Sequence, residues 1–173
     1  MSTHVVDQME RSVERIDDGD LAKLCEIAIE DSEDFFSRHR QYKSPTVCIA
    51  LCQGAALHYI DGQSGVKDFD VWTFYAKTDA PAFPVRRRGR RDFGKSKFGK
   101  NPDDVGFAGR RVDLLGRSIE ALPDPIASIQ AYLRQVRTKT TMELSRKAVV
   151  LLYPPHVRGK VAWPIPARSE GEQ

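Results

Sequence analysis

The chain has 173 residues, of which 40% are hydrophobic, and its formal net charge is +3. A chain of this length can bury about two thirds of its unfolded surface, so we expect a single domain over residues 1–167 and a disordered tail over residues 168–173. It contains no run of about eighteen apolar residues, and its N-terminus is too charged for a signal peptide, which predicts a cytoplasmic protein without membrane contact. Three cysteines without Cys-x-x-Cys spacing argue against a disulfide framework or a zinc site.

The first predicted element is an amphipathic helix over residues 20–38. Its apolar side chains recur at helical spacing, and Asp17, Asp18 and Asp20 can cap its start. Residues 1–40 as a whole carry eleven acidic and five basic side chains. The next expected elements are a buried strand over residues 46–51, a short helix over residues 55–60 and a second strand over residues 69–76.

Two carboxylates one residue apart begin the second strand. Side chains on a strand alternate between faces, so Asp68 and Asp70 point the same way while Phe69 and Val71 pack inward. Two carboxylates on one face repel each other unless a cation lies between them. Oxygen ligands of this kind suit Mg²⁺ or Mn²⁺, which bind through one or two carboxylates together with substrate phosphates. The pair therefore predicts a metal site that takes a nucleotide.

Gly54 and Ala55 follow the first predicted strand. Glycine has no Cβ and can take a positive φ, so a turn here can aim backbone N–H groups at a phosphate where the short helix begins. The alternative is a tight strand-to-helix connection without a ligand.

The segment 81–110 is predicted to be a long, exposed, basic loop. Residues 80–111 carry ten basic and three acidic side chains, with glycine and proline throughout. Its cations suit a triphosphate or RNA, and its phenylalanine rings could stack on bases. The alternatives are docking on the acidic N-terminal helix or an insertion without a specific ligand. The predicted contacts are Arg86, Arg87, Arg88, Arg90, Arg91, Lys95 and Lys97.

The remaining chain predicts further scaffold. Residues 148–153 are short and apolar, and we expect them to be the apolar end of the preceding helix rather than a late strand. Residues 163–166 contain two prolines and cannot be helical. The other expected elements are a strand over residues 111–115 and helices over residues 126–136 and 140–147.

The order of apolar strand, Gly54-Ala55, about a dozen residues and Asp68-x-Asp70 on a strand resembles the nucleotidyltransferase superfamily with the DNA polymerase beta-like fold. Within it, the stretch CQGAALHYIDGQSGVKDFDVW is most similar to the abortive-infection toxin type. Two departures are Ala55, where that family has Gly or Ser, and Val66, where it has Ser. The resemblance implies Mg²⁺-dependent transfer of a nucleoside monophosphate from an NTP to an acceptor such as RNA, a tRNA end or a protein, and an antitoxin-like protein partner.

The resemblance also implies a third carboxylate on a later strand, for which Asp113 is the match. Asp68 and Asp70 would bind metal and Asp113 would bind metal or act as a base. The alternative for Asp113 is a strand-edge residue that pairs with Arg110 or Arg111.

We therefore expect an α/β domain in which helices flank a small mixed sheet. Besides the enzyme, two other functions remain open. One is a non-catalytic member of the same fold that binds nucleic acid or a protein partner through the basic loop, which the missing hydroxyl at residue 55 favours. The other is a nucleotidyltransferase for small cationic molecules, which would need an acidic pocket.

Overall fold

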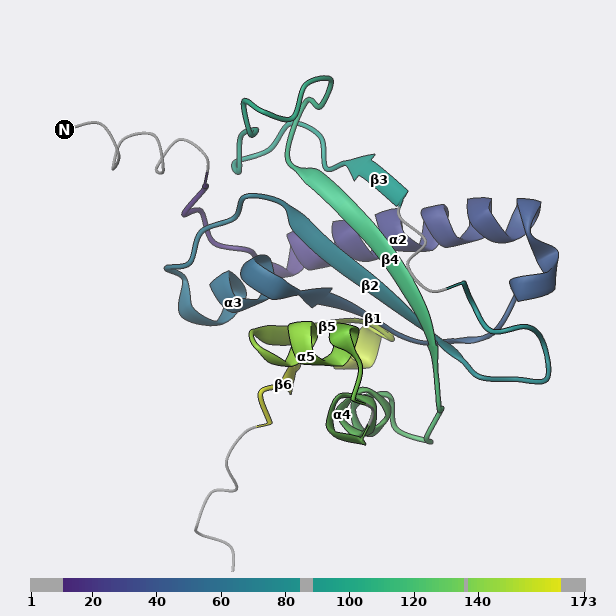
Figure 1. Cartoon of the computed structure of the whole chain (residues 1–173). Helices are drawn as coiled ribbons and strands as arrows, with labels where there is room; N and C mark the ends of the chain where they lie inside the picture. Colours follow the sequence, from purple (N-terminus) through teal and green to yellow (C-terminus); the bar gives the residue numbers. More distant parts are fainter. Residues whose placement is uncertain (1–10, 85–88, 136, 166–173) are drawn as a thin grey trace, which may run out of the picture.

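The computed structural model describes residues 11–84, 89–135 and 137–165. Its centre is a six-stranded sheet in the order β3-β4-β2-β1-β5-β6 (Figure 1). Among these strands β2 and β4 run parallel, and the other neighbouring pairs are antiparallel. The sheet is mixed and flanked by four described helices, which confirms the predicted fold class. The strands are β1 (Thr46–Cys52), β2 (Phe69–Ala76), β3 (Gly89–Asp92), β4 (Arg111–Ile119), β5 (Ala148–Tyr153) and β6 (Val161–Trp163). The helices are α2 (Asp18–Arg38), α3 (Gln53–Asp61), α4 (Pro125–Gln135) and α5 (Lys139–Ser145), with short 3₁₀ helices at Arg40–Tyr42 and Pro155–Val157.

Helix α2 covers one face of the sheet (Figure 1). Its start is fixed by a reciprocal cap: the Asp20 N–H donates to Asp17 Oδ1 and the Asp17 N–H donates to Asp20 Oδ2, both at 2.9 Å. The predicted helix and its acidic cap are therefore confirmed. Leu21 and Leu24 are fully buried against strand residues of this face.

Helices α4 and α5 cover the opposite face (Figure 1). Alternation along β1 sends Cys48 and Cys52 to this side, where both are buried free thiols. Burial raises the pKa of Cys48 to about 12, so the thiol is inert at neutral pH. The two cores hold the central strands β1 and β2 from both faces.

The segment 148–153 is strand β5, so the prediction of a helical end is wrong. β5 lies between β1 and β6, and its side chains alternate between the two cores, with Val150 and Leu152 on one side and Val149 and Leu151 on the other. A strand that is buried on both faces has a continuous apolar sequence, which has no period to separate it from a buried helix.

The segment 81–110 is largely exposed, as its composition predicted, but it is not a simple loop. It contains β3, and its rings at Phe83, Phe93 and Phe98 are buried. The rings of Phe93 and Phe98 lie 5.0 and 5.4 Å from that of Phe69, so they pack in the α2 core and are not exposed for base stacking. Its described basic side chains at residues 90, 91, 95, 97 and 100 remain exposed, and Arg110 is buried.

Asp92 closes the loop that follows β3. Its carboxylate accepts hydrogen bonds from the backbone N–H groups of Gly94, Ala108 and Gly109, which joins the two ends of the loop. Lys97 lies 3.0 Å from both Asp17 and Asp20, so this loop docks on the acidic start of α2. The docking alternative is thus the one observed here.

Parts of the earlier predictions fall outside the described residues. They include Arg86, Arg87 and Arg88 of the basic segment and the tail over residues 168–173. Within the described residues, no helix has both the length and the apolar character needed to span a bilayer.

Candidate functional site

The site begins at the turn from β1 into α3. Gln53 takes a φ of 60°, a left-handed conformation that non-glycine residues rarely adopt, so the positive φ expected at Gly54 lies one residue earlier. The thiol of the N-cap residue Cys52 donates back to the Ala50 carbonyl and makes no capping hydrogen bond, so it satisfies none of the first N–H groups of α3. This turn therefore presents backbone donors and the positive end of a helix dipole.

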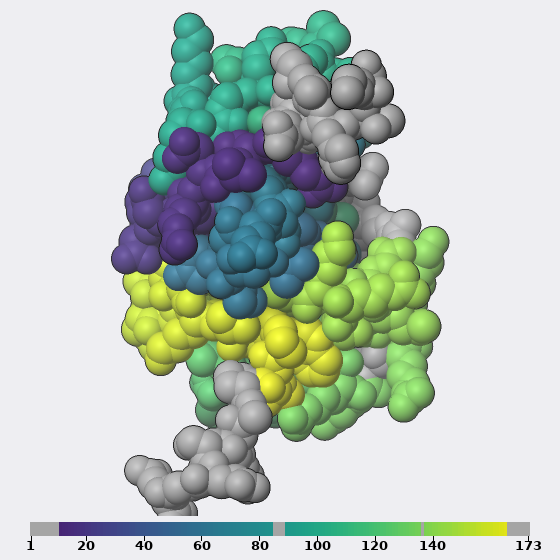
Figure 2. Space-filling view, turned by 90° about the vertical axis from the view of Figure 1, so that its left-hand side faces the viewer, coloured from purple at the N-terminus to yellow at the C-terminus, as the bar shows by residue number. Residues whose placement is uncertain are grey.

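A cavity of about 240 Å³ opens at this turn. It gathers four of the predicted site residues, Gly54, Ala55, Asp68 and Asp70. Figure 2 shows this end of the molecule, where the segment from residue 11 (purple), α3 (blue) and α5 (lime green) all reach one face. The other lining residues are Arg11, Gln53, Gly65, Lys67 and Lys147.

Three cations of this cavity were missed by the sequence analysis. Arg11 Nη1 and Lys147 Nζ each lie 4.0 Å from the position that a Cβ on Gly54 would occupy, and Lys67 precedes Asp68 directly. They come from distant parts of the chain. Arg11 is placed by the bridge between Ser12 and Val66, and Lys147 adjoins the bridge between Gln53 and Ala148. Neither bridge has a local sequence signal, so composition pointed to the basic segment instead.

A second cavity, of about 490 Å³, lies at the far end of β4. It is lined by residues such as Phe83, Arg117 and Tyr132, and none of the described predicted site residues contributes to it. Of these two cavities, the one at the start of α3 is therefore the one that predicted site residues line.

Asp68 and Asp70 approach this cavity from the start of β2. Asp68 is the residue before the strand, and its side chain is 26% exposed. Burial raises the pKa of Asp68 above its ordinary value, the charge of Arg111 opposes this rise, and the charges of Asp113 and Asp104 add to it. Asp68 Oδ2 accepts a hydrogen bond from Arg111, while its Oδ1 accepts none from the described residues.

Asp113 lies next to Asp70 on the parallel neighbour strand. The two residues are register partners, so their side chains share one face of the sheet. Both oxygens of Asp113 are held by Arg111, whose Nε and Nη2 each donate at 3.0 Å, and Arg90 Nε lies 3.7 Å from Oδ1. The pairing alternative for Asp113 is therefore present in this structure, together with the proximity to Asp70.

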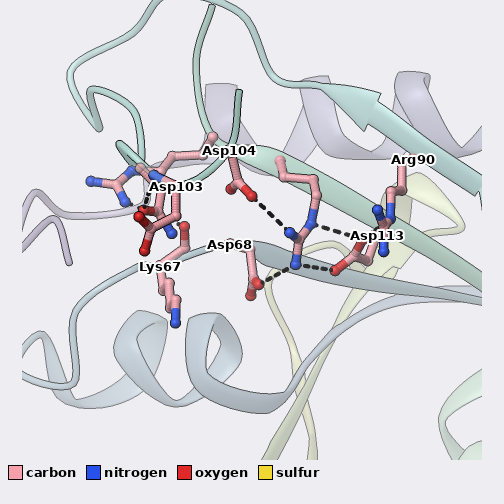
Figure 3. A network of polar contacts seen from close by, with 9 residues as sticks. Lys67, Asp68, Arg90, Asp103, Asp104 and Asp113 are labelled. Carbon is pink, nitrogen blue, oxygen red and sulfur yellow. Dashed lines mark hydrogen bonds and ion pairs between the residues drawn. The ribbon is translucent and has the colours of Figure 1, made fainter. Parts of the chain in front are cut away.

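Arg111 joins three carboxylates, and Asp104 is the one that the sequence analysis missed. Arg111 Nη1 donates to Asp104 Oδ1 at 2.8 Å. Figure 3 shows Asp68, Asp104 and Asp113 converging from three segments, with dashed lines that meet at one guanidinium. Burial lowers the pKa of Arg111, but the hydrogen bond and charge of Asp113, with the charges of Asp104 and Asp68, outweigh this effect and raise it. The guanidinium is therefore permanently charged.

The described basic residues of segment 81–110 do not line this cavity. Arg91 pairs with Asp31 and Asp34 of α2, and Lys95 is exposed. Arg90 and Lys97 pair as described above. Within the described chain, the cations at the cavity are thus Arg11, Lys67 and Lys147.

The oxygen donors at the cavity decide whether it can hold Mg²⁺. Among the described residues, no three Asp, Glu, His or Cys side chains gather as a metal-ligand set. Mg²⁺ often needs only one or two carboxylates, because waters and substrate phosphates complete its shell. Asp68 and Asp70 line the cavity and fit that requirement, although Arg111 also binds Oδ2 of Asp68. Asp113 does not line it, and both of its oxygens accept from Arg111.

The arrangement combines two carboxylates, three cations and a helix start around one cavity. Such a set can bind a phosphate chain and a divalent cation together.

A scan against protein-family models found no match for this chain, and searches of curated proteins and of solved structures found none either.

Proposed function

We propose that the chain is a Mg²⁺-dependent nucleotidyltransferase that moves a nucleoside monophosphate from an NTP to an acceptor. The observation that carries the proposal is the shared cavity, because Asp68, Asp70 and the Gly54-Ala55 turn all line it. These elements were expected to act together on the basis of their spacing, and they come from two different strand ends. The chemistry would join an acceptor oxygen to the α-phosphorus and release pyrophosphate.

Each part of the cavity has a role in this proposal. The N–H groups at Gly54 and Ala55 would donate to the β- and γ-phosphates. Arg11, Lys67 and Lys147 would compensate the negative charge of the triphosphate. Asp68 and Asp70 would hold Mg²⁺, which when bound supplies a clamp on the phosphate oxygens and neutralises developing charge.

The glycine at residue 54 offers a test of phosphate binding. A Cβ there would meet only the ends of two flexible side chains at 4.0 Å, so Gly54→Ala is expected to fold normally. The added methyl would occupy the space between two cations, where a phosphate must approach. We expect Gly54→Ala to weaken NTP binding at least about tenfold, or about 1.4 kcal/mol, in calorimetric titration. Unchanged NTP affinity would remove this turn from the site.

Activity is tested by label transfer. The protein is incubated with Mg²⁺ and each α-³²P-labelled NTP in turn, with total RNA or with the protein itself as acceptor. We expect labelled RNA or protein, and loss of label in the double variant Asp68→Asn/Asp70→Asn. The matched control is Asp79→Asn, because Asp79 is exposed and does not line the cavity. Equal transfer by wild type and double variant would contradict the proposed roles of both carboxylates.

A second candidate function is favoured by the contacts of Arg111. A site whose carboxylates are held by a guanidinium also fits a non-catalytic protein that binds nucleic acid or a protein partner. It predicts tight RNA binding without label transfer to RNA or protein for any NTP. The tRNA end and the antitoxin-like partner are further proposals that follow from the family resemblance, and the cytoplasmic location is a proposal that follows from the apolar and charge pattern of the sequence.

A further inference from the structure

We propose that the guanidinium of Arg111 is a built-in cation of the site, so that the chain binds one divalent cation, at Asp68 and Asp70, and has no place for a second beside Asp113. This inference rests on the proposed function, because it assumes that the cavity takes a metal and a nucleotide. It names a role for a residue that the proposed reaction does not otherwise use.

Arg111 is one of four neighbouring residues on the parallel strands β2 and β4 and the segment before β2. Asp70 and Asp113 are register partners on the parallel strands β2 and β4. Asp68 and Arg111 stand two residues before them, and alternation puts all four side chains on one face. Neighbouring strands are about 4.8 Å apart, and alternate residues are roughly 6.6 Å apart along a strand. Three carboxylates and one guanidinium therefore share a patch in which a second metal ion would have to lie.

The contacts of Arg111 already satisfy the oxygens that a second metal would need. Its Nε and Nη2 hold both oxygens of Asp113, and the same Nη2 lies 3.0 Å from Asp68 Oδ2. A paired hydrogen bond of this kind is among the strongest that carboxylates accept. A metal beside Asp113 would have to displace it.

Asp104 holds the guanidinium through a separate hydrogen bond. Its side chain is 10% exposed, its Oδ1 accepts from Arg111 Nη1 at 2.8 Å, and its Oδ2 is buried without a hydrogen-bond partner among the described residues. Asp113 is 5% exposed. Removal of Arg111 would leave Asp104 without its ion-pair partner and Asp113 with only Arg90 at 3.7 Å, so the guanidinium is bound in place rather than free to leave. Asp104 thus acts as a positioning residue for Arg111.

Asp68 and Asp70 are the two carboxylates that line the cavity. Asp68 Oδ1 accepts no hydrogen bond from the described residues, and both Asp68 and Asp70 line the cavity with the cations that suit a triphosphate. One metal between this pair and the phosphates is consistent with the usual shell of Mg²⁺. Arg111 would supply fixed positive charge next to it, as arginine does at other phosphoryl-transfer centres.

The test counts bound metal directly. Wild-type protein is saturated with Mn²⁺ and a non-hydrolysable α,β-methylene nucleoside triphosphate, the mass of the complex is measured by native mass spectrometry, and pulsed EPR reports pairs of Mn²⁺. We expect one Mn²⁺ per complex without dipolar coupling. Arg111→Gln, which removes the charge, is expected to bind two coupled Mn²⁺, whereas Arg111→Lys should still bind one. Arg117→Gln is the matched control on the same strand and should also bind one.

The outcomes separate this inference from the proposed function. Two coupled Mn²⁺ in the wild-type complex would overturn the role of Arg111 and leave the nucleotidyltransferase proposal standing. A single Mn²⁺ in a folded Arg111→Gln would also overturn it. Binding of neither Mn²⁺ nor nucleotide by the wild type would overturn both. The wild-type count needs no variant, so it decides the question even where Arg111→Gln does not fold.

Discussion

Replacing Arg111 by Gln is the most informative change for stability. The variant removes four hydrogen bonds to three carboxylates, of which Asp113 and Asp104 are at least nine-tenths buried and Asp68 is 26% exposed. Breaking a buried ion pair by removing one partner costs about 3–5 kcal/mol, because the other charge stays buried. Asp68 remains partly in water, so we expect a loss near the lower end, about 3 kcal/mol of unfolding free energy.

This loss is a large part of the total unfolding free energy of a single domain. Single domains are stable by about 5–15 kcal/mol, and about 3 kcal/mol would lower the melting temperature by roughly 6–12 °C in a domain of this size. Because burial raises the pKa of Asp68 and Arg111 opposes that rise, the variant should raise it further. A raised carboxyl pKa means that the folded state binds more protons than the unfolded state. The difference in unfolding free energy between wild type and Arg111→Gln should therefore become smaller as the pH falls toward that pKa.

Urea unfolding at pH 7 measures the effect, with Arg38→Gln as the matched control. Arg38 also pairs with a carboxylate at 2.9 Å, but the two side chains are 60% and 52% exposed, and such pairs contribute only about 0.5 kcal/mol or less. A loss below about 1 kcal/mol for Arg111→Gln would refute the argument, because Arg111 would then behave as an ordinary surface arginine.

Three further predictions concern the loop after β3 and the cavity. Gly109→Ala should lower the unfolding free energy by about 3 kcal/mol in urea titration, because its Cβ would collide with the backbone carbonyl of Gly94; a normal midpoint would contradict this packing. Asp92→Ala should cost about 1–2 kcal/mol at pH 7, since it removes three hydrogen bonds at an exposed site. Burial alone would raise the pKa of Asp92, but hydrogen bonds from the backbone of Ala108, Gly94 and Gly109 lower it. The extra unfolding free energy of wild type over Asp92→Ala should therefore be complete above the ordinary pKa of 3.8 and decrease as the pH falls through the folded pKa. A difference that stays unchanged below the folded pKa would contradict the role of these hydrogen bonds. Lys147→Ala should weaken NTP binding about tenfold and reduce its salt dependence in calorimetry, whereas an unchanged salt dependence would place the triphosphate elsewhere.

Elements with a strong local signal were predictable from sequence. The acidic cap and apolar spacing of α2 specify its start within two residues, and the alternation after Asp68 matches β2. The short helix expected over residues 55–60 is α3, and the Gly54-Ala55 turn and the Asp pair line one cavity, as their spacing indicated. These features depend on residues close in sequence.

Features that depend on tertiary neighbours were not predictable. The sequence of β5 predicts a helical end because both faces of the strand are buried and its apolar run has no period. Phe93 and Phe98 belong to a basic segment whose composition indicates exposure, yet their rings are buried in the core. Asp104 reaches the site from a loop, and its contact with Arg111 has no spacing rule. The cations of the cavity likewise arrive through bridges between distant residues, so charge counting along the chain could not find them.

The most direct test of the account is a crystal structure with Mn²⁺ and a non-hydrolysable nucleoside triphosphate, in which anomalous scattering locates the metal. The account predicts one anomalous peak between Asp68 and Asp70, the triphosphate at Gly54 and Ala55, and Arg111 still bound to Asp113. Nucleotide density away from this cavity, or a metal beside Asp113 in place of Arg111, would contradict it.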